Sequence, residues 1–250
     1  MVIGGWAWTN AAASTAPAGC TRLVLTGHPA YPPVAWAEGA TLDGAAIEVV
    51  RRLSKDAGVS LAVVNEGSWD GAQRAVRDGK ADAIVGVYLT AQRAAYLDYV
   101  RPALAPDPSA VLVRVGTTFH YAGWNSLIGK RGVLGAGESF GASFDEFLRT
   151  KLTTYRVNGD AAVYRGVVDG RADYGLTGYY AALIHAPKEK IVIAAPKFVT
   201  ENLYLAFGKR SPCSELAPAF SKDIARMAAD GTIARLFAAA LSTYPRPTAR

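Results

Sequence analysis

Short runs of β-branched residues alternate with helix-like patterns from Thr21 onward, and this alternation limits the choice of fold more than any other feature. Residues 22–25 (RLVL) predict a strand. Residues 42–57 predict a helix, because apolar side chains recur there at three-residue spacing until Gly58 ends the pattern. Alternating strands and helices are typical of an α/β protein with a mostly parallel sheet.

The same patterns predict further elements in two groups. The expected strands are 60–64, 82–85, 110–115, 131–134, 155–157, 173–176, 190–193 and 203–207, and the expected helices are 69–79, 143–152, 160–169, 179–186, 214–229 and 232–241. Between the groups, residues 101–108 contain three prolines, which enforce extended backbone and exclude a helix. We therefore expect this stretch to cross between two lobes.

Composition and motifs exclude several classes of protein. The net charge of +6 comes from Lys and Arg that are scattered without a run of five, so we expect no nucleic-acid partner. No apolar stretch of the folded body approaches the ~20 residues of a membrane-spanning helix. The two cysteines lack metal-ligand spacing, and the nucleotide-binding glycine motifs are absent, so we expect no metal and no cofactor.

The first 20 residues resemble the tail of an export signal. They carry no charge and end with Ala16, Pro17 and Ala18 before Gly19 and Cys20, an arrangement that suits signal peptidase. A basic start is missing, and an unstructured leader is the alternative. We assign residues 1–20 to a leader or to the remnant of an export signal.

Residues 137–141 (GESFG) match the G-x-S-x-G pattern of hydrolases, with Ser139 as the nucleophile between a strand and a helix. His185 is the only histidine that follows it, and it lies near the end of its own predicted helix. The alternative is a glycine-rich turn at 135–137 whose backbone N–H groups bind an anion such as a carboxylate.

Aromatic residues fall in or beside predicted loops at the carboxyl ends of strands, where ligands bind in open α/β sheets. They are Tyr31, Trp36, Trp69, Tyr88, Tyr179 and Tyr180. Either contact with a ligand or packing against the sheet edge would explain each of them.

Several short segments, in this order and at this spacing, resemble one protein family. They are 28–33 (HPAYPP), 42–44 (LDG), 69–71 (WDG), 79–86 (GKADAIVG), 89–93 (LTAQR), 97–99 (LDY), 169–173 (DGRAD) and 229–232 (ADGT). From Thr21 to about Tyr244 the chain resembles the type II periplasmic solute-binding proteins of bacterial amino-acid ABC transporters, extracellular solute-binding protein family 3.

The resemblance implies a two-lobed, periplasmic-binding-protein-like "Venus flytrap" fold that traps a solute as the lobes close. Each lobe would hold a mostly parallel sheet with helices on both faces. Lobe one would comprise residues 21–104 and 203–250, and lobe two residues 108–200. The second crossing between the lobes would lie near 196–202.

The resemblance also implies roles for residues in the cleft. Arg93, in the T-x-x-R segment, would bind the carboxylate of the ligand, because a guanidinium offers two parallel hydrogen bonds and keeps its charge when buried; a surface arginine is the alternative. Tyr31 and Trp69 would flank the ligand side chain. Gly86 would offer a carbonyl, and Ser139 a backbone N–H and a hydroxyl.

Three positions depart from the family pattern. Tyr88 stands where a Ser or Thr hydroxyl is usual, and Glu138 precedes Ser139 where lobe two usually has paired Thr or Ser. Gly178 stands where an Asp usually pairs with the α-ammonium, which puts an ordinary α-amino acid in doubt unless Glu138 takes that role. His28, where binders of basic amino acids tend to carry an Asp, argues against Lys or Arg as the ligand.

The resemblance further implies a function and a location. We expect a non-enzymatic, monomeric carrier in the periplasm, or outside the membrane and attached to it, that hands a small carboxylate-bearing, amino-acid-like solute to an ABC permease. One alternative is a lyase similar to cyclohexadienyl dehydratase, with Glu138 as general acid. Another is a sensor or an accessory binding subunit.

A disulfide between Cys20 and Cys213 follows from the family's lobe-one sheet. In that sheet, the first strand starts at the end far from the cleft, and the strand at 203–207 runs toward the same end. Both cysteines should therefore lie there, and an exported protein favours their pairing; two unpaired thiols in a cytoplasmic protein are the alternative.

Overall fold

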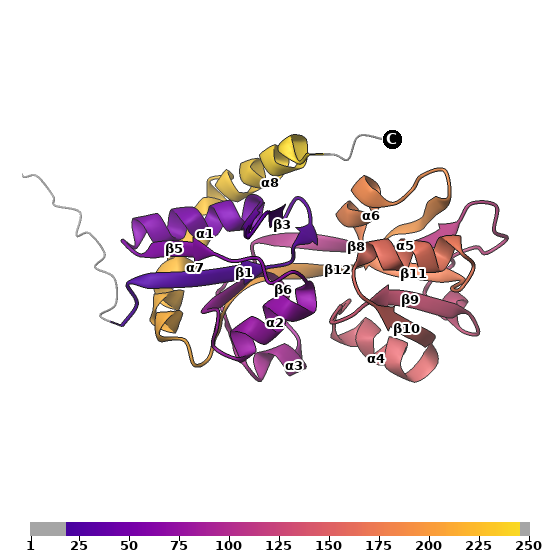
Figure 1. Cartoon of the computed structure of the whole chain (residues 1–250), viewed down its shortest axis with the longest axis horizontal. Helices are drawn as coiled ribbons and strands as arrows, with labels where there is room; N and C mark the ends of the chain where they lie inside the picture. Colours follow the sequence, from indigo (N-terminus) through magenta and orange to yellow (C-terminus); the bar gives the residue numbers. More distant parts are fainter. Residues whose placement is uncertain (1–18, 246–250) are drawn as a thin grey trace, which may run out of the picture.

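The computed structural model describes residues 19–245 as an α/β fold built on one long mixed sheet. The strand order is β10-β9-β11-β8-β12-β6-β1-β5, and β7 pairs with β12 beside this path. Figure 1 shows two lobes joined by β8 and β12. The expected two-lobed α/β architecture is confirmed, whereas nearly all of the predicted leader lies outside the described residues.

The strands of each lobe pair in parallel, and the strands that cross between the lobes pair antiparallel. The large sheet contains β1 (Arg22–Gly27), β5 (Ser60–Val63), β6 (Ala83–Tyr88), β7 (Leu97–Tyr99), β8 (Ala105–Arg114), β9 (Arg131–Gly135), β10 (Thr153–Val157), β11 (Tyr174–Gly178) and β12 (Ile191–Gly208). In lobe one, β1 lies parallel to β5 and β6, and in lobe two β9 lies parallel to β10 and β11. β8 and β12 make antiparallel pairs with each other and with β11 and β6, and so the whole sheet is mixed.

Helices cover both faces of each lobe (Figure 1). They are α1 (Ala45–Asp56), α2 (Trp69–Arg77), α3 (Ala91–Ala94), α4 (Ala142–Lys151), α5 (Asp160–Val168), α6 (Tyr179–His185), α7 (Ala217–Ala229) and α8 (Thr232–Thr243), with 3₁₀ turns η1 (Trp124–Leu127) and η2 (Pro212–Leu216). α1 and α7 share one core of lobe one through Ile47 and Phe220, and α2 covers the other face through Trp69. In lobe two, α5 and α6 share one core, and α4 belongs to the other. Within residues 19–245, every helix falls short of the length and hydrophobicity that a membrane-spanning helix needs.

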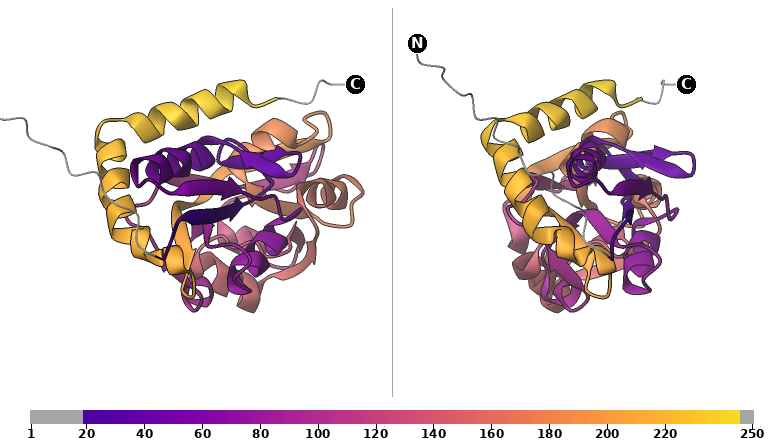
Figure 2. Two further views of the ribbon diagram at one scale, coloured as in Figure 1. Left: turned by 60° about the vertical axis from the view of Figure 1, so that its left-hand side comes forward. Right: turned by 90° about the vertical axis from the view of Figure 1, so that its left-hand side faces the viewer.

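The C-terminal helices wrap around lobe one. Figure 2 shows α7 and α8 meeting at a sharp corner, with α8 running across the top of the molecule. Gly231 forms this corner in the left-handed region, at a φ of 75°, which glycine adopts at little cost. The far end of α8 reaches lobe two, where the Tyr244 hydroxyl lies 3.0 Å from Nε2 of His185 in α6.

Both crossings between the lobes are strands. The predicted strands at 110–115, 190–193 and 203–207 are parts of β8 and β12, and the predicted crossing at 196–202 lies inside β12. Register shifts along β12 between Ile193 and Val199 bend it as it passes between the lobes. The residue boundaries of the two lobes, 21–104 with 203–250 and 108–200, stay predictions.

Some short elements lack a sequence signal. β2 (Ala30–Tyr31), β3 (Ala35–Glu38) and β4 (Thr41–Asp43) form a small antiparallel sheet before α1, which therefore begins at Ala45 and not at residue 42. Strands of two to four residues are too short for a period-two pattern to reveal.

The predicted disulfide is present. Cys20 and Cys213 are bonded, with their Cα atoms 4.9 Å apart, and both are buried. Because β6 lies between β1 and β12, these two strands are not neighbours. The segments before β1 and after β12 therefore lean together at the end of lobe one that is far from the cleft.

Candidate functional site

A small cavity lies between the lobes and brings the predicted cleft residues together. Its wall contains His28, Tyr31, Trp69, Gly86, Tyr88, Arg93, Asp107, Ser109, Glu138, Ser139, Phe140 and Gly178. Every residue predicted to contact the ligand is in this set. The space open to the centre of a water molecule is about 20 Å³, room for about one water. The two lobes therefore approach each other closely at this cavity.

Arg93 is a buried guanidinium at one side of this cavity. The Thr90 hydroxyl caps α3 by accepting from the Arg93 backbone N–H at 3.2 Å, which fixes the start of this one-turn helix. The Arg93 side chain is 5% exposed, and it donates to Gln73 Oε1 at 3.1 Å and to the Gly137 carbonyl of lobe two at 3.0 Å. It forms no ion pair with any residue in 19–245.

A buried carboxylate, Asp107 of β8, lies in the same cavity wall. It is 1% exposed and accepts hydrogen bonds from the Tyr31 hydroxyl at 2.7 and 2.6 Å and from the Tyr88 hydroxyl at 2.5 Å. Burial raises the pKa of Asp107 to about 7, despite the two phenol donors, which favour the ionised form. Burial also raises the pKa of both tyrosines well above the usual value, and the charge of Asp107 adds to that effect.

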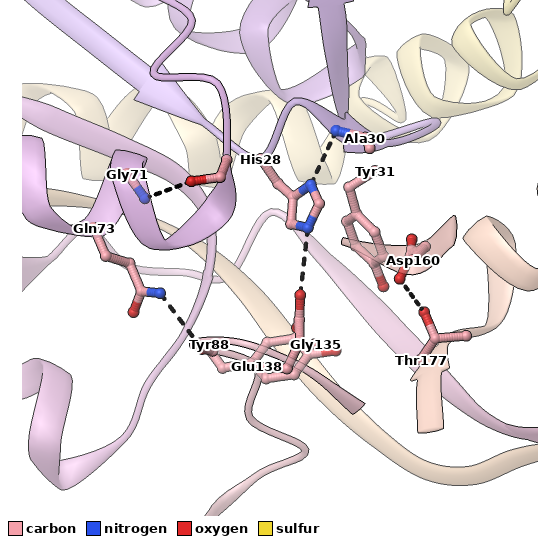
Figure 3. A network of polar contacts seen from close by, with 12 residues as sticks. His28, Ala30, Tyr31, Gly71, Gln73, Tyr88, Gly135, Glu138, Asp160 and Thr177 are labelled. Carbon is pink, nitrogen blue, oxygen red and sulfur yellow. Dashed lines mark hydrogen bonds and ion pairs between the residues drawn. The ribbon is translucent and has the colours of Figure 1, made fainter. Parts of the chain in front are cut away.

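His28 and Glu138 form a contact across the cleft, which Figure 3 shows. His28 Nδ1 accepts from the Ala30 backbone N–H at 3.0 Å, so the proton of the neutral ring is on Nε2, which lies 3.3 Å from Glu138 Oε1. The His28 ring stacks on Trp69 at a centroid distance of 5.6 Å. The Arg93 guanidinium lies 5.4 Å from the Trp69 ring, so Trp69 contacts two cleft residues of lobe one.

A third carboxylate, Asp160, lies farther out in the cleft, in a neighbouring hollow that His28 and Glu138 also line. It begins α5 and accepts from the Thr177 hydroxyl at 2.9 Å (Figure 3). Burial raises its pKa, while His28 acts in the opposite direction. Besides Asp160 and Glu138, this hollow is lined by Asp70 and Arg74, which pair with each other.

The nucleophile interpretation of Ser139 is wrong. Its hydroxyl donates to Asp145 Oδ2 at 2.5 Å, and that carboxylate also accepts from the Phe140 N–H, so both groups serve the start of α4. His185 contacts Tyr244 instead of Ser139. Without a histidine base beside the hydroxyl, this segment is not a hydrolase nucleophile elbow.

The turn at 135–137, proposed to bind an anion, uses part of its donor set within lobe two. The Ala136 N–H donates to the Val157 carbonyl, and the Glu138 N–H donates to the Gly135 carbonyl. These donors are satisfied within lobe two. The Gly137 carbonyl faces lobe one and accepts from Arg93.

Comparisons with known proteins agree with this two-lobed site. Residues 23–242 match the family model of the bacterial extracellular solute-binding proteins, family 3. The chain belongs to this family. No curated protein sequence matches it significantly.

Solved structures with the same fold come from proteins with different roles. An amino-acid ABC transporter substrate-binding protein from Streptococcus pneumoniae, bound to L-arginine, is 20% identical, with a TM-score of 0.74 over 89% of this chain and 95% of that one. A histidine kinase sensor domain with similarity to periplasmic binding proteins is 19% identical, with a TM-score of 0.74 over 88% and 96%. An ancestral amino-acid-binding protein, a precursor of cyclohexadienyl dehydratase, is 23% identical, with a TM-score of 0.71 over 88% and 95%. At these identities the likeness establishes the fold alone.

Gly178 and Gly86 are two positions of this family 3 protein where glycine has a structural reason. The Tyr31 ring occupies the space that a side chain at position 178 would need. Gly86 has a φ of 75°, and a Cβ there would come within 2.8 Å of Val34. Tyr31 has thus taken the place where a carboxylate at position 178 would sit.

Sequence reasoning missed Asp107 and Gln73 as cleft residues. Asp107 lies between two prolines in the predicted crossing segment. That position between the lobes was the one sequence signal that could have marked it as a cleft residue. Gln73 lies on the buried face of α2, and its role as the acceptor from Arg93 depends on how α2 and α3 pack. The other predicted aromatic residues, Trp36, Tyr179 and Tyr180, do not line the cavity.

Proposed function

We propose that this protein captures a small, amino-acid-like solute that carries both a carboxylate and a cationic nitrogen, and holds it between its lobes. The observation that supports this most strongly is Arg93, a buried guanidinium at the interlobe cavity that has no ion pair within the described residues 19–245. A buried charge is costly unless an opposite charge meets it. A ligand carboxylate would supply that charge and would exchange for the neutral Gly137 carbonyl.

The carboxylates of the cleft are the reason for proposing a cationic group on the solute. Asp107 and Glu138 line the same cavity as Arg93, and a simple dicarboxylate would meet repulsion there. A zwitterion would satisfy both signs of charge. His28, held between Ala30 and Glu138, lies where a long basic side chain would extend, so we expect a compact ligand.

We further propose that the protein acts outside the cytoplasmic membrane and delivers its solute to the permease of an ABC transporter. The family consists of extracellular solute-binding proteins, and the buried disulfide suits an oxidising compartment. Transfer to a permease would then couple lobe opening to release.

A dehydratase on the same scaffold is the second candidate, because Glu138 faces the cavity and lies 3.3 Å from Nε2 of His28. Incubation with prephenate or arogenate separates the two functions. A carrier leaves both compounds unchanged, whereas a dehydratase forms an aromatic product and loses that activity in Glu138→Gln.

A thermal-shift screen tests the proposed function. The panel contains amino acids, betaines and simple carboxylic acids, and calorimetry then measures the affinity of each hit, because a ligand that binds the folded state raises the melting temperature. We expect the hits to be compact zwitterions. Hits confined to nitrogen-free acids, or the absence of any hit, would contradict the proposal.

A further inference from the structure

We propose that Asp107 is the partner of the solute's cationic nitrogen, opposite Arg93 in the same cavity. This inference rests on the proposed function and adds the residue that selects a zwitterion over a simple acid. Asp107 belongs to the crossing strand β8. The cationic nitrogen of the solute would therefore bind at the hinge between the lobes.

Asp107 is the most deeply buried carboxylate in the cleft and lacks a counter-charge. It is 1% exposed, lines the cavity, and pairs with no Lys, Arg or His among residues 19–245. The charge of Arg93 lies in the same wall, yet the two side chains do not form an ion pair with each other. A ligand with both charges can neutralise both groups at once.

The two tyrosines orient Asp107 and leave it able to accept another donor. Oδ2 accepts from both phenols, at 2.6 Å from Tyr31 and 2.5 Å from Tyr88, whereas Oδ1 accepts only from Tyr31, at 2.7 Å. A carboxylate has about four acceptor sites. Oδ1 therefore retains capacity for an N–H of the ligand, and the two aromatic rings give the cation an apolar and polarisable wall.

The other carboxylates are less suited to this role. Glu138 already faces His28 Nε2 at 3.3 Å, and its side chain is 27% exposed. Asp160 lines the neighbouring hollow instead of the cavity, and it accepts a hydrogen bond from the Thr177 hydroxyl. Position 178 cannot supply a side chain, because the Tyr31 ring fills that space.

The proposed role of Asp107 predicts a change in its protonation when the ligand binds, and this change can be measured. Its pKa is raised by burial to about 7, and Glu138 adds to this effect while His28 and the phenols of Tyr31 and Tyr88 oppose it. A bound cation would favour the ionised form. Binding of a zwitterion at pH 7 should therefore release a fraction of a proton, about half at most.

The test compares zwitterions with acids of the same shape that lack nitrogen. The pairs are L-alanine with propionate, L-leucine with 4-methylpentanoate, L-proline with cyclopentanecarboxylate, and glycine betaine with 3,3-dimethylbutanoate. Calorimetry measures each pair on the wild type and on Asp107→Asn. We expect Asp107→Asn to weaken the best zwitterion by roughly 30-fold or more, while the matched acid changes little.

Asp82→Asn is the matched control, since Asp82 also accepts two hydrogen bonds in a protected place but lies at the far end of lobe one. It should leave the affinity unchanged. If Asp107→Asn keeps the wild-type preference for zwitterions, or if Glu138→Gln loses it instead, this inference fails while the proposed function stands. A wild type that prefers the nitrogen-free acids overturns both.

A second measurement needs only the wild type and does not depend on the folding of a variant. Calorimetric titration with the best zwitterion at pH 7, in two buffers of different ionisation enthalpy, gives the number of protons exchanged. Proton release with the zwitterion, and none with its matched acid, supports Asp107 as the partner. Proton release of the same size with the zwitterion and with its matched acid would overturn it.

Discussion

Two aspartates at opposite ends of lobe one show how this chain separates stability from function. Asp82, at the far end, accepts from the Val24 N–H at 2.8 Å and from the Ser211 hydroxyl at 2.7 Å, and so ties β1 to the turn after β12. Asp107, at the cleft, accepts from two tyrosine hydroxyls, and it is buried without a counter-charge among residues 19–245.

The difference lies in which groups complete each site. The far end of lobe one is completed by the chain itself, through backbone N–H groups, Ser211 and the nearby disulfide. The cleft keeps two opposite charges, Arg93 and Asp107, in one cavity without pairing them. Changes at the far end should therefore alter stability and spare binding. Changes at the cleft should alter binding, and should alter stability in a way that depends on the protonation of Asp107.

The largest expected effect is on stability, at the far end. Replacing both Cys20 and Cys213 with Ser should lower the free energy of unfolding by about 2–5 kcal/mol, because the bond closes a very long loop. Urea denaturation measures this loss, and the affinity for the best zwitterion should stay within twofold. A tenfold loss of affinity would show that the two ends are coupled. Two reactive thiols in the denatured, unreduced wild type would disprove the bond itself.

The next effect concerns the pH dependence of stability at the cleft. The pKa of Asp107 in the folded state, about 7, lies above its ordinary value of 3.8, so the proton favours the folded state. That stabilisation is fully present below about pH 4 and is lost as the pH rises through 7. Between pH 4 and pH 8 the wild type should lose up to about 4 kcal/mol relative to Asp107→Asn.

Denaturation of both proteins at the two pH values measures this difference, and the other titrating groups cancel in the subtraction. The groups that face Asp107, namely Tyr31, Tyr88, Glu138 and His28, are present in both proteins. Parallel pH profiles would contradict the burial of an unpaired carboxylate at this site.

A cleft residue could be predicted from the sequence where it lies in a segment with recognisable spacing. The predicted cleft residues come from segments with recognisable spacing, and the structure places all of them around one cavity. Asp107 has no such signal, because its tyrosine partners lie 76 and 19 positions away in the chain. Its environment exists only after the lobes and the crossing strands have assembled.

The fold shows the same limit. Helices such as α1 and α5 have periodic apolar faces and were predictable to within a few residues. The crossing strands β8 and β12 were predicted only in pieces, since prolines at 106, 108 and 196 interrupt the strand pattern. Pairing between two crossing strands, a long-range contact, compensates for those interruptions.

Removal of the cleft arginine should weaken binding strongly. Arg93→Ala should weaken the best zwitterion by roughly 100-fold, about 3 kcal/mol, because a bidentate charged contact in a buried site is lost. Arg171→Ala is the control, since Arg171 is exposed and pairs with Asp169. Equal affinities of Arg93→Ala and the wild type, measured by calorimetry, would remove Arg93 from the site.

The smallest effect is expected at the edge of the cleft. Glu138→Gln should change the affinity for a zwitterion by less than about fivefold, because Glu138 is partly exposed and solvent screens its contact with His28. Affinities for the matched nitrogen-free acid should rise slightly as a repulsive charge is removed. If Glu138→Gln weakened zwitterion binding more than Asp107→Asn does, Glu138 and not Asp107 would be the partner of the ligand nitrogen.

The most direct test of the account is a crystal structure of the protein with its tightest-binding zwitterion. We predict that the carboxylate of the ligand accepts hydrogen bonds from the Arg93 guanidinium, and that its nitrogen lies against Asp107 between the rings of Tyr31 and Tyr88. A ligand bound outside this cavity, or one whose nitrogen points away from Asp107, would contradict the account.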